Sequence, residues 1–336
     1  MRRAIASAVR RAWAGDGAIA AALAPLGWLY GGAMAARNAA YRRGLRRVTA
    51  PPVPTVSIGN LTVGGTGKTP VSAWFADALA ARGARPGVVL RGYGDDEPLV
   101  HRTLVPSAVV IADPDRVRGS TRAVAEGAVV VVLDDAFQHR RAGRTADVVL
   151  LAAEQGWPRR CLPAGPLREP WAGLRRADLL LVTRKTADAA TAAAFARRLA
   201  AAFDRPVAVV ELAAGGLRAA AGRPADAPPP GSSVLAVSGI GEPAAFLGQL
   251  ASSGWSVVPA TYPDHHAFTE ADVTELATRG AEVDAVVCTL KDAVKLAPRW
   301  PAGAPPLWYL SQVVRIDSGR AHLDGLLDRL HPFPLS

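Results

Sequence analysis

The chain of 336 residues has little of what staples a small secreted protein or builds a structural metal site. Its two cysteines, Cys161 and Cys288, are far apart and have neither a disulfide framework nor metal-ligand spacing, so we expect a reducing compartment. Aromatic residues make up 6% of the chain and do not alternate with the arginines as they do in nucleic-acid binders. We therefore expect no nucleic-acid partner, and nothing in the sequence predicts an obligate protein partner.

Negative charge is also in short supply. Lys and Arg number 39 against 29 Asp and Glu, which gives a net charge of +10, and arginine supplies most of the excess. Such a balance indicates an anionic partner, either a phosphorylated substrate or an anionic lipid surface. Half of the residues are hydrophobic, which is enough for a large core and typical of a globular α/β protein.

The amino-terminal region lacks an unbroken run of strongly apolar residues. Residues 17–36 carry no charge, but much of the stretch is Ala and Gly, and Pro25 interrupts it. Arginines flank it on both sides, from Arg2 to Arg11 and from Arg37 to Arg47, so a spanning helix is disfavoured. We expect a helix within 1–47 that lies in the membrane interface; the alternative is an Ala-rich helix packed on the protein. The apolar residues that would enter lipid are Leu23, Leu26, Trp28, Leu29 and Tyr30.

Residues 55–70, TVSIGNLTVGGTGKTP, are the most informative segment. An apolar strand over 56–58, a Gly-rich turn and a helix over 71–82 predict a phosphate-binding loop (P-loop). In such a loop Lys68 contacts the β- and γ-phosphates of a nucleotide, and the Thr69 hydroxyl contacts Mg²⁺. Thr62 stands where the general pattern has Gly. The predicted nucleotide ligands here are Thr62, Val63, Gly64, Gly65, Thr66, Gly67, Lys68 and Thr69.

The rest of the chain alternates apolar strands with Ala-rich helices, which predicts a mostly parallel, doubly wound α/β fold. We expect a P-loop domain over 48–220, a linker over 221–233 that is rich in Pro, Ala and Gly, and a second α/β domain over 234–336. The predicted strands are 87–90, 108–111, 129–133, 148–151, 179–182 and 207–210, followed by 234–237, 257–260 and 285–288.

Polar residues follow several of these strands, at the edge where parallel sheets bind ligands. Asp134 and Asp135 end the strand over 129–133 and are predicted to organise Mg²⁺, although a lone Asp in that place is usually a helix cap. Residues 262–269, YPDHHAFT, concentrate titratable groups and favour an acid/base role over a metal site. His101 and His322 stand alone, and we assign them no role.

Taken together, the ordered motifs GNLTVGGTGKTP, RGYG, DEP, LDDAFQH, LPAGPLRE, VSGIG, YPDHHAFT and LKDAVKL resemble the tetraacyldisaccharide 4′-kinase family of lipid A biosynthesis across nearly the whole chain. The resemblance implies a P-loop kinase of two α/β/α domains, held on the cytoplasmic face of the bacterial inner membrane by its amino-terminal helix. It also implies transfer of the ATP γ-phosphoryl group to the 4′-hydroxyl of an acylated glucosamine disaccharide 1-phosphate, giving lipid IVA. The alternatives are a P-loop kinase of a soluble small molecule and a membrane-associated P-loop ATPase switch.

The same resemblance implies roles for individual residues. Arg168 and Glu169 match a pair that lines the nucleotide and metal site, and Arg116 matches an active-site arginine that contacts substrate or transition state. Asp96 matches the catalytic base and His265 its dyad partner. RGYG and DEP are fused here, so Asp95 competes with Asp96, and the choice of His265 over His266 rests on the motif alone.

Overall fold

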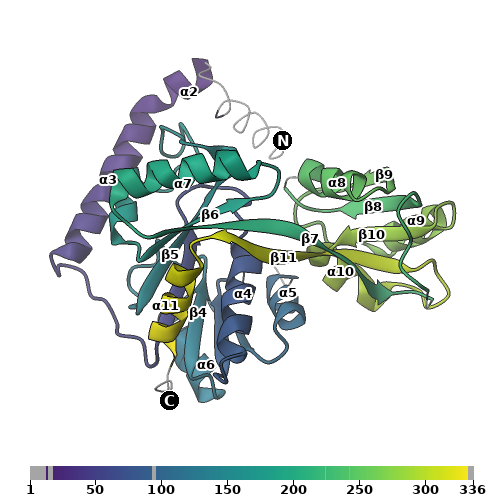
Figure 1. Cartoon of the computed structure of the whole chain (residues 1–336), viewed down its shortest axis with the longest axis horizontal. Helices are drawn as coiled ribbons and strands as arrows, with labels where there is room; N and C mark the ends of the chain where they lie inside the picture. Colours follow the sequence, from purple (N-terminus) through teal and green to yellow (C-terminus); the bar gives the residue numbers. More distant parts are fainter. Residues whose placement is uncertain (1–12, 14–17, 93–95, 224, 242, 332–336) are drawn as a thin grey trace.

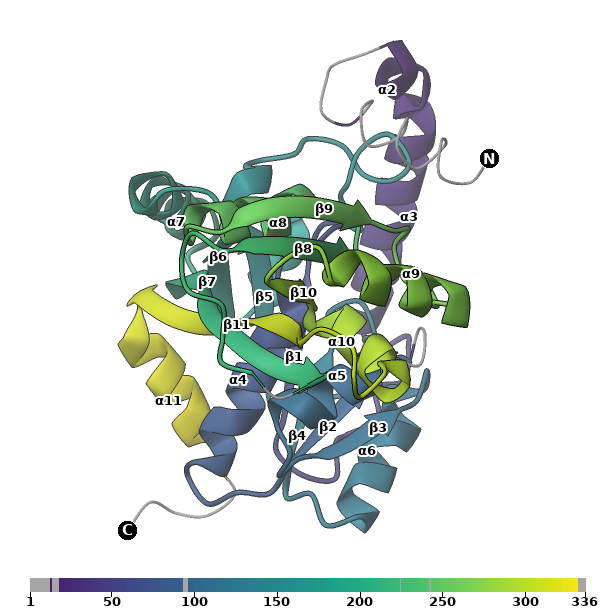
Figure 2. The same cartoon turned by 90° about the vertical axis from the view of Figure 1, so that its right-hand side faces the viewer.

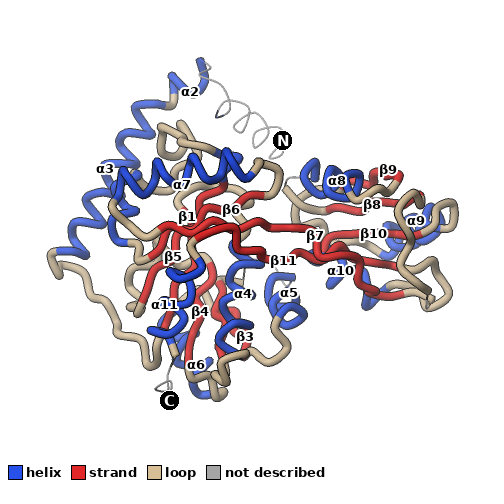
Figure 3. Tube along the Cα trace, viewed as in Figure 1, coloured by secondary structure: helices blue, strands red, loops and turns tan. Residues whose placement is uncertain are grey.

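The computed structural model describes residues 13, 18–92, 96–223, 225–241 and 243–331. It is a mixed α/β protein in which one sheet runs through a larger and a smaller part, with helices on both faces (Figures 1 and 3). The strands are β1 Thr55–Asn60, β2 Pro86–Leu90, β3 Val109–Ala112, β4 Val130–Asp134, β5 Ala146–Ala152, β6 Leu179–Arg184, β7 Val207–Ala221, β8 Ser233–Ser238, β9 Ser256–Thr261, β10 Ala285–Thr289 and β11 Leu307–Ser318. The helices are α2 Ala18–Ala22, α3 Ala24–Arg42, α4 Lys68–Ala80, α5 Asp96–Leu104, α6 Arg116–Ala125, α7 Ala189–Phe203, α8 Pro243–Ser252, α9 Glu270–Gly280, α10 Leu290–Leu296 and α11 Arg320–Leu330, with short 3₁₀ turns at Ala153–Gln155, Trp171–Arg176 and Ala297–Arg299.

The eleven strands follow the order β3-β2-β4-β1-β5-β6-β7-β11-β10-β8-β9. Neighbouring strands are parallel except for β7 and β11, which pair antiparallel. The predicted α/β fold with mostly parallel strands is confirmed, and each strand expected from the sequence is present. The P-loop strand β1 lies between β4 and β5, so the residues that follow β1 and β4 emerge side by side.

Helices cover both faces because the strands are apolar on both sides. In the larger part, α4 and α11 bury Phe75 and Leu327 on one face, and α7 buries Phe195 on the other. In the smaller part, α9 and α8 cover opposite faces through Leu276 and Leu250. The fold therefore has three layers in each part.

The two parts share one sheet. The resemblance had implied two α/β/α domains, each with a sheet of its own. Strand β7 runs on to Ala221, far beyond the predicted 207–210, and pairs with β11 along almost its whole length. Figure 1 shows these two long strands reaching from one part into the other. The division of the chain into a P-loop domain over 48–220, a linker over 221–233 and a second domain over 234–336 stays a prediction.

The carboxyl-terminal helix α11 returns to the larger part. It lies beside α4 (Figure 2), and four of its leucines, Leu323, Leu326, Leu327 and Leu330, belong to the same core as the P-loop helix. Residues 320–330 therefore complete the P-loop half, although they follow the second half in sequence.

At the other end of the chain, α3 lies along the edge of the larger part. Its outer face exposes Trp28 and Leu29, which are 74% and 72% accessible, and its inner face buries Gly27 and Gly31. Among the described residues, no helix has the length and apolarity needed to cross a membrane.

Candidate active site

The predicted P-loop connects β1 to α4, as the motif requires. Gly67 is the residue before α4 and has a φ of +84°, a left-handed conformation that favours glycine. A Cβ at this position would lie 2.2 Å from Leu212 Cδ1, so Gly67 also makes a close approach to β7. Val63, Gly64 and Gly65 form the exposed crest of the loop.

The base of the loop is fixed by buried threonines. Thr62 donates its hydroxyl hydrogen to Gln155 Oε1 at 2.6 Å and bridges to Leu167, which explains how a residue other than Gly is accommodated there. Thr66 accepts a hydrogen bond from Asn60 Nδ2 at 2.9 Å, and its carbonyl accepts one from Thr183 Oγ1 at 2.9 Å. These bonds preorganise the loop before a ligand arrives.

Lys68, Asp135 and Arg168 meet at the mouth of the loop. Lys68 Nζ lies 3.9 Å from Asp135 Oδ1, and Arg168 Nη1 donates to the same oxygen at 2.7 Å. Burial is the main reason that the pKa of Lys68 is lowered, and the neighbouring Asp135 charge works in the opposite direction. Asp135 itself has a φ of +49°. The structure thus brings together three predicted site residues from the start of α4, the end of β4 and the loop after β5.

Asp134 is held differently from its neighbour. One of its carboxylate oxygens accepts a hydrogen bond from Ser72 Oγ at 3.1 Å, and the other is hydrogen-bonded to His101 Nε2 at 3.0 Å. Burial opposes ionisation of Asp134, but these hydrogen bonds and the charges of His101 and Lys68 outweigh it and lower the pKa of the carboxyl. His101, to which the sequence assigned no role, is fully buried and ties α5 to the end of β4. The available signal in the sequence was a histidine three residues after the DEP motif.

The structure brings Asp96 and His265 together across the two parts. Asp96 begins α5 and is 5% exposed, while His265 follows β9 and has a φ of +57°. His265 Nδ1 lies 3.3 Å from Asp96 Oδ2, and Lys295 Nζ lies 3.8 Å from the same oxygen. Lys295 stands four residues after Lys291 in the LKDAVKL motif, and no sequence pattern predicts a role for it.

His266 points into the smaller part. Its Nε2 lies 2.9 Å from Asp272 Oδ2, its ring stacks on Tyr262, and its carbonyl oxygen accepts a hydrogen bond from Lys295 Nζ at 3.0 Å. Geometry therefore favours His265 over His266 as the partner of Asp96. Asp95 lies outside the described residues, so its competition with Asp96 stays an open prediction.

Glu97 connects the two groups of charges. Burial raises the pKa of its carboxyl, and it interacts electrostatically with Lys291, Asp134, Asp96 and His265. The P-loop, the acidic pair and the Asp96–His265 pair therefore form one polar site where α5, α10 and the β1 and β4 ends meet.

Two predicted site residues are held in other surroundings. Arg116 is buried behind the acidic pair, where its guanidinium donates to the backbone oxygens of Asp113 and Asp134 at 2.8 and 2.9 Å. Glu169 is fully buried, and its oxygens accept hydrogen bonds from Arg176, Gln138 and Asn38. Burial alone would raise the pKa of Glu169, but these donors hold that pKa below its ordinary value. The substrate role of Arg116 and the metal role of Glu169 stay predictions.

The oxygen donors of the site can be compared with the ligands that a divalent metal requires. The described part of the chain has no group of three or more His, Cys, Asp or Glu side chains that could hold a metal ion by itself. Magnesium bound with a nucleotide needs fewer, because one or two carboxylates act with the phosphates and water. Asp135, which is about a third exposed, and the Thr69 hydroxyl, which makes no hydrogen bond within the described residues, fit that requirement.

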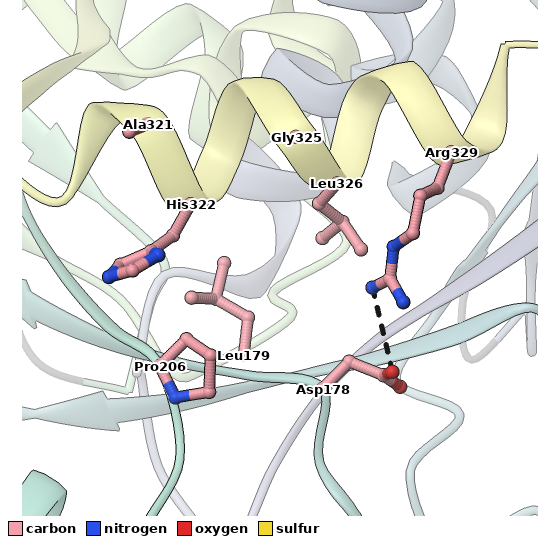
Figure 4. A pocket seen from close by; sticks show the side chains of 8 residues that line it. All are labelled: Asp178, Leu179, Pro206, Ala321, His322, Gly325, Leu326 and Arg329. Atoms are coloured by element: carbon pink, nitrogen blue, oxygen red, sulfur yellow. Dashed lines mark ion pairs between the residues drawn. The ribbon is translucent and has the colours of Figure 1, made fainter.

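A pocket of about 210 Å³ lies elsewhere, under α11, and includes none of the predicted site residues (Figure 4). Its wall carries an ion pair between Arg329 Nη2 and Asp178 Oδ1 at 3.5 Å. The predicted residues Lys68, Asp134 and Asp135 lie instead near the carboxyl ends of β1 and β4.

A P-loop on a parallel sheet, with an acidic pair and an Asp–His pair beside it, defines a P-loop kinase. The chain matches the family model described as tetraacyldisaccharide-1-P 4′-kinase over residues 19–98 and 94–331. It is 40% identical to the tetraacyldisaccharide 4′-kinase of Alkalilimnicola ehrlichii, covering 92% of this chain and 93% of that one, and 37% identical to that of Halorhodospira halophila, covering 95% and 96%. The chain belongs to the tetraacyldisaccharide 4′-kinase family and is an enzyme, a kinase.

A solved structure agrees with this assignment. The crystal structure of LpxK from Aquifex aeolicus in complex with ATP superposes with a TM-score of 0.73 at 26% identity, covering 93% of this chain and 99% of that one. The similarity spans both parts of the fold, so the agreement is not confined to the P-loop half.

Proposed function

We propose that this kinase transfers the γ-phosphoryl group of ATP to the 4′-hydroxyl of a tetraacyl glucosamine disaccharide 1-phosphate, forming lipid IVA. The family membership supports the substrate class, and the meeting of Asp96 with His265 carries the mechanistic part. A phosphoryl acceptor must be positioned and must lose its hydroxyl proton, and the Asp–His pair supplies a group for that step beside the P-loop.

Each part of the site has a defined task in this proposal. Lys68 and the backbone N–H groups of the loop bind the triphosphate, and the Asp96 carboxylate accepts the proton of the sugar hydroxyl. His265 orients that carboxylate, and Lys295 holds the backbone of the histidine loop through the carbonyl of His266. Mg²⁺, held by Asp135 and Thr69 with help from Asp134, would neutralise charge on the phosphates.

The proposed location of the enzyme rests on helix α3. Helix α3 presents Leu26, Trp28 and Leu29 to solvent, and arginines cluster at its carboxyl end. An apolar face next to basic residues fits an anionic membrane surface, where an acylated substrate resides. We place the enzyme at the cytoplasmic face of the inner membrane, bound peripherally through this face.

The direct test follows label from γ-labelled ATP into a purified acylated glucosamine disaccharide 1-phosphate. The wild-type chain should label the lipid, and Lys68→Ala should remove most of the transfer, because its charge acts on phosphates. Arg205→Ala, an exposed change at the opposite edge of the sheet, is the matched control. ATP hydrolysis without labelled lipid would support the ATPase switch instead.

A further inference from the structure

Helix α3 is bonded to the segments that carry the candidate site. Tyr30 Oη donates to the carbonyl oxygen of Arg168 at 2.9 Å, and Arg37 Nη2 donates to that of Gln138 at 2.8 Å. In the other direction, Arg140 Nη1 donates to the carbonyl oxygen of Asn38 at 2.9 Å. Attachment of a helix to a membrane needs none of these bonds.

Asn38 makes the deepest of these contacts. It is a buried polar residue on α3, and its Nδ2 donates to Glu169 Oε2 at 2.7 Å. Glu169 Oε1 accepts from Gln138 Nε2 at 2.9 Å, and the same amide donates to the carbonyl oxygen of Asn60 at 2.9 Å. Asn60 in turn donates to Thr66 inside the P-loop. A continuous set of hydrogen bonds therefore joins α3 to the phosphate-binding loop.

Tyr30 begins a second, shorter connection. Its hydroxyl fixes the backbone at Arg168, and the Arg168 guanidinium holds Asp135 beside Lys68. The two connections begin about two turns apart on α3 and end at different residues, one at Thr66 in the P-loop and the other at Asp135. A displacement of α3 would therefore disturb both the loop and its acidic partner.

The helix also has little room to shift. A Cβ on Gly27 would lie 2.9 Å from Ala164 Cβ and 3.0 Å from the carbonyl oxygen of Cys161, and one on Gly31 would lie 3.3 Å from Cys161 Sγ. The absence of side chains at Gly27 and Gly31 lets α3 lie directly on residues 161–164, just before Arg168. This close packing transmits the position of the helix to the loop.

We infer that Tyr30 and Asn38 are positioning residues for the nucleotide site, so that α3 holds Arg168, Glu169 and the P-loop in place as well as presenting its outer face to a membrane. The inference rests on the proposed nucleotide role of Lys68 and Asp135. Removing a residue that orients a binding group typically lowers affinity or activity about tenfold or more.

The test compares Tyr30→Phe and Asn38→Leu with Tyr41→Phe in the full-length chain. Tyr41→Phe also removes a hydroxyl from α3, but that hydroxyl makes no hydrogen bond within the described residues. Four quantities are measured: the Kd of a fluorescent ATP analogue, KM for ATP and for the acyl disaccharide, cosedimentation with anionic vesicles, and the melting temperature.

We expect KM for ATP and Kd of the analogue to rise about tenfold for Asn38→Leu and about threefold for Tyr30→Phe. KM for the acyl disaccharide and vesicle binding should stay near wild type, and Tyr41→Phe should change nothing. Should Asn38→Leu fail to fold, the gentler Tyr30→Phe decides.

Wild-type nucleotide affinity in both inner-face variants would overturn the inference and leave α3 as an attachment helix. Equal losses in all three variants would also overturn it, because they would report general loosening of the helix. If the wild-type chain labels no lipid, the proposed substrate is wrong, whereas the analogue Kd still tests the positioning role.

Discussion

His265 Nδ1 lies 3.3 Å from Asp96 Oδ2, although 169 positions separate the two residues in the chain. Asp96 is buried at the start of α5, and the side chain of His265 is 43% exposed on the smaller part. Contact between them depends on how the two parts of the shared sheet face each other. The candidate base is therefore assembled by tertiary structure.

The pair predicts a kinetic signature. Asp96→Asn should lower kcat far more than KM for ATP, because the group acts mainly in the transition state, and His265→Ala should do likewise. If the two act as a unit, the double variant should be little worse than either single variant. Steady-state kinetics on the four proteins provide the check, and additive losses would mean that the residues act independently. Asp95→Asn is the neighbouring control and should have a mild effect.

Outer-face changes on α3 should separate membrane binding from nucleotide binding. Trp28→Ser with Leu29→Ser removes two exposed apolar side chains, so cosedimentation with anionic vesicles should drop about tenfold or more. Val258→Ser, an exposed apolar residue on β9, is the matched control and should bind as wild type. Unchanged vesicle binding in the α3 variant would refute the proposed membrane face. Deleting α3 is a poorer test, because it would also remove Tyr30 and Asn38.

Alanine variants of Gly67 and Gly83 should separate the cost of backbone strain from the cost of steric overlap. Both have a positive φ, +84° and +86°, but only a Cβ at Gly67 meets another atom, Leu212 Cδ1. Gly83→Ala should cost about 1 kcal/mol of unfolding free energy from conformation alone. Gly67→Ala should cost about 2–4 kcal/mol and weaken ATP binding as well. Denaturant titrations measure both, and equal costs would contradict the close approach to Leu212.

Asp113 predicts a pH dependence of stability. Its hydrogen bond from Arg118 is the main reason that its pKa is lowered, against an opposing effect of burial. Because the folded pKa lies below the unfolded value of about 4, this pair stabilises the fold above pH 4, and the contribution is lost as pH falls through the folded value. Asp113→Asn should therefore cost about 1 kcal/mol at pH 7, since Arg118 is largely exposed, and clearly less at pH 3. Urea midpoints at the two pH values test this, and an equal cost at both would reject the electrostatic origin.

Local pattern was enough to predict the elements that build the nucleotide site. The strands β1 and β4 are short, apolar and bounded by Gly or acidic residues, so their existence and the edge at which Lys68 and Asp135 emerge follow from sequence. Asp96 and His265 came from resemblance to a family, because no local rule joins residues so far apart.

The other elements and contacts depend on interactions between segments that are far apart in the chain. The outer half of β7 contains Ala213, Ala214, Gly215 and Gly216, which have weak strand preference, and it is held in the sheet by β11. Neither β11 nor α11 was predicted. The roles of His101 and Lys295 were missed for the same reason, since each acts on a carboxylate from a distant segment.

The route of the chain sets an order for folding. Strands β8 to β10 and their helices lie in sequence between β7 and β11, and the helix that follows β11 supplies four leucines to the core under the P-loop. A ribosome releases those leucines only after all eleven strands, so the nucleotide-binding half stays incomplete until the second half has been synthesised. During that interval the unfinished core exposes apolar surface, and we expect chaperones to bind the nascent chain more strongly before residue 330 emerges than after it.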